Sequence, residues 1–170
     1  MDDLDQWYPP EHPPMPTGPE HFPSSGLNSL ATFWPRAAAR VLDSLLIGVP
    51  VLVIVAVVSY SASSADTGVP RWGSALWFVL AVAYETSLVA WRGQTLGKMA
   101  LGIKVARLDN GRPPLWWQAA IRICLPAATA AFPFDIAIIV YPTVFLTAGF
   151  DPIRRGIHDR AGGTVVVVAR

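Results

Sequence analysis

Three acidic residues lie within or beside strongly apolar stretches of this sequence. Asp43 comes just before a long apolar run, Glu85 lies inside a second run, and Asp135 lies in a third, proline-rich one. An ionisable side chain near the middle of a bilayer costs about 2.5–3.5 kcal/mol on insertion scales, so such residues mark sites of function unless a structural partner neutralises them. Asp43 and Glu85 are candidates for proton or cation binding, whereas we interpret Asp135 as an acid in an exposed turn.

Two arginines precede Asp43 at helical spacing. Arg36 lies seven positions before Asp43, close to two helical turns, and Arg40 lies three positions before it, so one helix face carries all three. We expect Arg40 to reach the Asp43 carboxylate directly. One interpretation is that these charges fix the entry of a helix and pair with a neighbouring helix. The other is a proton or cation site at Asp43, with Glu85 assisting and Arg36 tuning the carboxylate.

Signatures of an enzyme are not found in this sequence. The stretch Gly93–Lys98 has one residue too few between its glycines for a phosphate-binding loop, and Met99 stands where that motif needs Ser or Thr. Cys124 has apolar neighbours, which favours an inert thiol. We therefore expect no catalytic residue, no metal ion and no cofactor. The net charge of +1, without a basic patch, also disfavours nucleic acid as a partner.

The composition predicts a membrane protein, since 52% of the side chains are hydrophobic and only 15% are charged. No charged residue occurs from Ser44 to Ala65, and we predict a first transmembrane helix over residues 37–59, kinked at Pro50. A second is predicted over residues 72–91, with tryptophans near both ends, as is typical of spans. A basic stretch follows it, which indicates the cytoplasmic side.

The third apolar region, residues 123–150, is long for one span and short for two, and prolines interrupt it. Four arginines follow it, so we predict a helical hairpin that turns near residues 132–134 and returns them to the cytoplasm. The fold class expected is an all-α membrane protein with two full transmembrane helices plus this Pro-interrupted hairpin. That gives four membrane segments with both termini cytoplasmic, and a topology of three spans stays open.

Outside the spans, the sequence predicts three simpler features. Residues 1–30 hold seven of the sixteen prolines, and we expect a disordered, Pro-rich cytoplasmic tail there. Leu96, Met99 and Ile103 have the spacing of a short interfacial helix. The β-branched stretch Thr164–Val168 is too short to span, and we expect it to pair as a strand with Ile103–Arg107.

Several blocks of residues occur in an order that is specific to one family. The blocks are Phe33–Arg36, Val41–Leu46, Gly93–Lys98 with Gly102–Val105, Arg122, and Arg154–Val166. Together they resemble the RDD family of bacterial membrane proteins, which is named for one Arg and two Asp. The resemblance implies a transmembrane domain over residues 31–170, in which Arg36, Asp43 and Asp159 are the named residues. The supporting residues that lie in the same blocks are Gly93, Thr95, Gly97, Lys98, Arg122 and Arg155. Arg40 departs from the family pattern, and we count it as a supporting residue because of its spacing from Asp43.

The Asp159 carboxylate lies in a cytoplasmic segment by this scheme, and we expect it to pair with Arg36 or Lys98. Such a pair would tie the C-terminal segment to the first helix. Because some members of the family look like cation/proton antiporters, the first hypothesis is a transport-related protein of the bacterial inner membrane that handles a proton or monovalent cation. That hypothesis requires a homo-oligomer, because four short segments are few to line a path. The alternative is a non-catalytic accessory or scaffold subunit of a larger membrane complex.

Overall fold

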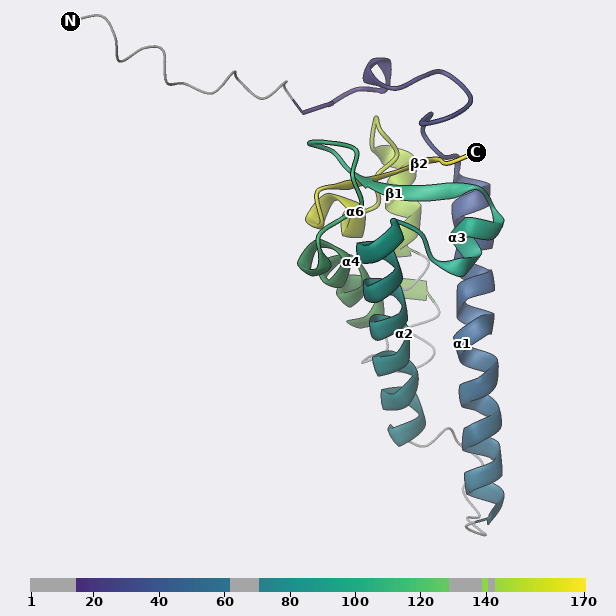
Figure 1. Ribbon diagram of the computed structural model, residues 1–170. Helices are drawn as coiled ribbons and strands as arrows, with labels where there is room; N and C mark the ends of the chain where they lie inside the picture. The colour runs from purple at the N-terminus through teal and green to yellow at the C-terminus, as the bar shows by residue number, and fades with distance from the viewer. Residues whose placement is uncertain (1–14, 62–70, 129–138, 141–142) are drawn as a thin grey trace, which may run out of the picture.

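Two long helices lie antiparallel in the structure, a computed structural model that describes residues 15–61, 71–128, 139–140 and 143–170 (Figure 1). The first, α1, covers Phe33–Ser61, and the second, α2, covers Arg71–Arg92. At 1.5 Å per residue α1 is about 43 Å long, which exceeds a hydrocarbon layer of about 30 Å. The excess matches the first turns of α1, which carry the charged residues.

Both helices are long and apolar enough to cross a bilayer, and among the described residues no others are. Only 17% of the most apolar stretch of α1 and 22% of that of α2 is buried, whereas the core helix of a soluble protein would be mostly buried. Large apolar side chains such as Leu45, Leu52 and Val53 are exposed on α1. The two predicted segments are therefore helices and candidate membrane spans, each slightly longer than expected, and Pro50 lies inside α1.

The helix that enters the third apolar region begins at Trp116, before the apolar stretch that starts at residue 123. Helix α4 covers Trp116–Ala128 and contains Pro126, and a 3-10 helix, η4, covers Thr147–Phe150. The predicted turn at residues 132–134 and Asp135 lie outside the described residues, so the hairpin stays a prediction.

An antiparallel pair of strands corrects the expectation of an all-α fold. Strand β1 covers Ile103–Arg107 and β2 covers Thr164–Val168, in the pairing that the sequence predicts. Both segments are rich in β-branched side chains and too short to span, so they form a sheet at the end of the helices (Figure 1). Short helices precede the two strands: α3, Leu96–Ala100, as predicted, and α6, Ile157–Ala161. Ile103, which was assigned to the predicted interfacial helix, belongs to β1 instead.

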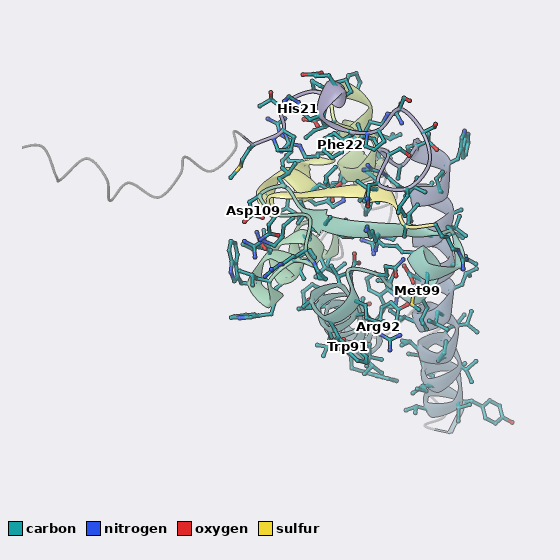
Figure 2. All side chains as sticks on the ribbon, turned by 45° about the horizontal axis from the view of Figure 1, so that its top comes forward. His21, Phe22, Trp91, Arg92, Met99 and Asp109 are labelled. Carbon is teal, nitrogen blue, oxygen red and sulfur yellow. The ribbon has the colours of Figure 1, made fainter. Side chains whose placement is uncertain are left out.

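The sheet buries side chains on both faces. One face, with Val105 and Val166, packs against Ala39 of α1, Val89 of α2 and Ala119 of α4. The opposite face packs against the N-terminal segment, and its cluster consists of Ala106, Val165, Val167, Phe22, Leu30 and Leu108. His21 and Phe22 accordingly lie across the sheet from Trp91, Arg92 and Met99 (Figure 2).

The sequence predicts a disordered tail over residues 1–30, but residues 15–30 are ordered in the structure. The segment contains the 3-10 helix η2, Pro19–His21. The backbone N–H groups of Asn28 and Ala31 donate to the carbonyls of Val168 and Val166, and Leu30 forms a bridge with Val167. An edge strand offers unpaired backbone groups, and β2 uses them to hold this segment. Residues 1–14 lie outside the described part of the chain.

Candidate functional site

Asp43 is 3% exposed and ties α1 to the elements beside it. Its Oδ1 accepts hydrogen bonds from the Tyr84 hydroxyl, at 2.7 Å, and from the Gly97 backbone N–H, at 2.8 Å. Its Oδ2 accepts from the Thr95 hydroxyl at 2.5 Å. Three donors thus satisfy the hydrogen-bonding capacity of this buried carboxyl group. Asp43 thus acts as a fixed anchor between α1, α2 and the start of α3.

The close approach of α3 to α1 depends on Gly97. A Cβ atom there would overlap the Ala39 carbonyl oxygen and lie 2.9 Å from the Asp43 carboxyl. The Thr95 hydroxyl caps α3 by accepting from the Lys98 backbone N–H at 3.4 Å. This close backbone approach allows the Gly97 N–H to donate to the Asp43 carboxylate.

Glu85 carries a second buried cluster, with bases on both sides of its carboxylate. The Arg40 Nη1 donates to Oε2 at 2.5 Å, and the Lys98 Nζ donates to Oε1 at 3.2 Å. The prediction that Arg40 pairs with Asp43 is replaced by this pair, because the Asp43 oxygens turn toward α3. Burial lowers the pKa of Lys98, and the charge of Glu85 opposes that change.

Asp159 carries the third cluster, and it contains the predicted contact with Arg36. The Arg122 Nη2 lies 2.7 Å from Oδ1, and the Arg36 Nη1 lies 3.4 Å from Oδ2. Burial alone would raise the pKa of Asp159, but the charges of Arg122, His158 and Arg36 outweigh it and lower the pKa to about 2. Arg36 also donates to the carbonyls of Arg154 and Val166, at 2.5 and 3.1 Å. Helix α1 is thereby joined to α6 and β2.

The second and third clusters line one cavity of about 330 Å3. Its charged side chains are Arg36, Arg40, Glu85, Lys98, Arg122 and Asp159. Apolar residues, including Phe33, Ile103 and Val166, form most of the remaining wall. His158 also lines it, and burial lowers the pKa of His158 to about 4, so this imidazole is neutral at pH 7.

Most of the residues expected from the sequence fall into two groups. The cavity gathers Arg36, Arg40, Glu85, Lys98, Arg122 and Asp159, while Asp43, Thr95 and Gly97 form the neighbouring anchor. Gly93, with a φ of +70°, follows the last residue of α2 in the turn before α3, and its missing Cβ leaves room for the Val105 carbonyl of β1. Arg155 does not join either group, because it pairs with Asp151 at 3.2 Å.

Sequence reasoning missed two participants. Tyr84 was not singled out, although a hydroxyl inside an apolar span and next to Glu85 is a signal for a buried hydrogen bond. Phe145 was also missed; its ring lies 4.8 Å from the Arg40 guanidinium carbon and 4.8 Å from the His158 ring. Nothing in the spacing of Phe145 predicts these contacts, because they depend on how the segment after α4 packs against α1.

Two exposed apolar helices with a charged cavity at one end define a mostly helical membrane protein. The sequence profile of the RDD family matches residues 30–163, so the chain belongs to the RDD family. An uncharacterized protein of Bacillus subtilis (strain 168), YckC, is 26% identical over 140 residues, which cover 82% of this chain and 85% of that protein. No solved structure matches this chain.

Proposed function

We propose that this protein is a small, transport-related protein of the bacterial inner membrane that binds a charged solute in the cavity at the end of α1 and α2. The observation that carries the proposal is the cavity itself, in which charged side chains from five helices, α1, α2, α3, α4 and α6, surround about 330 Å3 of space. Buried ion pairs contribute little net stability compared with apolar packing, so their position around an open space supports a role in binding.

In this proposal Glu85 binds and releases the proton, and Asp43 holds α1 against α2 and α3. The oxygens of Asp43 already accept three hydrogen bonds from protein donors, which leaves it poorly suited to bind a cation. Glu85 lines the cavity and is held by two bases. Protonation of Glu85 would release Arg40 and Lys98 from their pairs, which couples a proton to the charge of the cavity.

The proposed topology places this cavity and both termini on the cytoplasmic side. The start of α1 lies at the same end of the molecule as the C-terminus and the sheet (Figure 1). Bases at this end, among them Arg92, Lys104 and Arg112, agree with the excess of positive charge in cytoplasmic loops. Phe145 lies 4.8 Å from the Arg40 guanidinium carbon near the start of α1, and this contact supports a proposed hairpin between α4 and η4.

Proton movement in proteoliposomes tests the proposal. A pH-sensitive dye trapped inside would report proton movement driven by sodium, potassium or phosphate gradients. We expect movement with the wild type, its loss in Glu85→Gln, and its retention in Arg107→Gln, whose arginine pairs with Asp109 outside the cavity. If wild-type and protein-free vesicles behave alike under every gradient, the transport role is wrong. An accessory subunit of a larger complex would then be the better description.

The partners that follow are the lipid bilayer and further copies of this chain. Two described spans are too few to enclose a path through a membrane. Cross-linking of the reconstituted protein in dilute vesicles tests this: a homo-oligomer gives discrete bands, whereas a monomer that still moves protons would contradict it.

A further inference from the structure

The cavity carries more positive than negative charge. Its described lining holds four bases, namely Arg36, Arg40, Lys98 and Arg122, against the two carboxylates of Glu85 and Asp159. Each carboxylate is shared by two bases, so the surplus is two positive charges, or one where Lys98 is neutral. His158 adds none at pH 7. Uncompensated charge in a partly buried place is unfavourable, and an anion in the cavity relieves it.

Donors without partners point to where that anion binds. The Nε and Nη1 atoms of Arg122 are buried and have no hydrogen-bond partner among the described residues, and the same holds for the Nε of Arg36. Arg122 is only 4% exposed and lines the cavity, while its remaining nitrogen, Nη2, contacts Asp159. Buried guanidinium donors are rarely left unsatisfied. A planar arginine fork matches the oxygens of a carboxylate or phosphate.

The size and walls of the cavity narrow the class of ligand. A volume of about 330 Å3 corresponds to roughly eleven waters at about 30 Å3 each, which is more than one oxyanion needs. Apolar walls such as Phe33, Ile103 and Val166 suit an uncharged part of the same molecule. A phosphate monoester carries a charge of about −1.5 to −2 at pH 7, which matches the surplus better than a carboxylate does.

We propose that this cavity binds a phosphate group of the monoester class, with Arg122 and Arg36 as its principal donors. The phosphate comes either from a small soluble molecule or from a lipid head group, since the cavity lies where the spans emerge from the apolar layer. This inference rests on the proposed use of the cavity for binding, but it needs no transport.

Binding to the purified full-length chain tests the proposal. Titration calorimetry in mild detergent would use inorganic phosphate and glycerol phosphate at constant ionic strength, with chloride as the control anion. Nanodiscs with and without phosphatidic acid would supply the lipid source. We expect saturable binding of at least one phosphate source and about a tenfold or greater loss of affinity in Arg122→Gln, because charge-assisted hydrogen bonds are lost. Arg107→Gln removes one positive charge outside the cavity and is expected to bind as the wild type does.

A second variant keeps the test decisive if Arg122→Gln fails to fold. Ala37 lines the cavity, and Ala37→Leu fills part of it without changing any charge. We expect Ala37→Leu to weaken phosphate binding while the protein stays monodisperse. Binding of the soluble phosphates alone, or of phosphatidic acid alone, identifies the source. The proposal is overturned if no phosphate source binds more tightly than chloride, or if Ala37→Leu binds as the wild type does.

The two proposals fail in different ways. Phosphate binding without proton movement would keep the ligand and discard the transport role. Proton movement without phosphate binding would do the reverse.

Discussion

Removing the charge of Asp159 should destabilise the protein strongly. Asp159 is 1% exposed and lies between Arg122 and Arg36, so Asp159→Asn leaves two guanidinium groups near one neutral amide. Breaking a buried ion pair by removing one partner costs about 3–5 kcal/mol. For a chain of this size, each kcal/mol shifts the Tm by about 2–4 °C, so we expect a decrease of about 6–20 °C. Heating in mild detergent followed by fluorescence-detected size exclusion measures it.

A double-mutant cycle with Arg122→Gln isolates the pair itself. Each single change strands an opposite charge, whereas the double change removes both, so its cost should be smaller than the sum of the two. We expect a coupling of about 1–3 kcal/mol, in the range measured for residues in contact. Asp109→Asn is the matched control, because Asp109 pairs with Arg107 at the surface and should lose at most about 1 kcal/mol. Additive effects of Asp159→Asn and Arg122→Gln would refute the reasoning.

A simple exchange of Arg36 and Asp159 is not expected to restore the fold. Arginine at position 159 would face Arg122, whose Nη2 now lies 2.7 Å from the carboxylate. A rescue experiment must therefore change Arg36, Arg122 and Asp159 together, because both arginines contact the same carboxylate.

Three further changes test the anchor and the cluster. Gly97→Ala should displace α3 from α1 and lower the Tm by several degrees, whereas Gly111→Ala, in a turn with open space at its Cβ, tests only the strain of positive φ. Tyr84→Phe removes the hydrogen bonds to Asp43 and from the Leu96 N–H and should cost about 1–3 kcal/mol, measured by thermal unfolding; an unchanged Tm would contradict the anchor. Because the pKa of Asp159 is lowered from 3.8 to about 2, its stabilisation is present above pH 4 and is lost as the pH falls to 2. The difference in Tm between the wild type and Asp159→Asn should narrow over that interval, and a constant difference would count against it.

The parts of the fold that the sequence predicts are those set by local pattern. An apolar run as long as Leu45–Val58 must form a helix in lipid whatever surrounds it, and the β-branched run Thr164–Val168 is too short to do so. Pairing between distant charges is different. Arg40 and Asp43 share a helix face, yet Arg40 pairs with Glu85, 45 residues away, because three donors from elsewhere already occupy Asp43.

The sequence predicts most of the residues of the candidate site, but it does not predict the cavity that they line. The sequence singles out the six charged residues of the cavity, since each lies near an apolar stretch or a family block. It could not predict that they surround one space, because that depends on how η4 and α6 fold back beside α1. The order of residues 15–30 was missed for a related reason: the edge of β2 that holds them exists only after the strands have paired.

The contact between Arg36 and Asp159 joins residues 123 positions apart, and this separation sets the order in which the protein can mature. The ribosome delivers α1 first, so Arg36 stays hydrated at the membrane surface while most of the chain is still being made. The Arg40–Glu85 pair needs only the first two helices, whereas the contacts of Arg36 and Arg122 with Asp159 need α6 as well. A chain that stops before residue 159 would therefore carry Arg36 and Arg122 without the carboxylate that both contact.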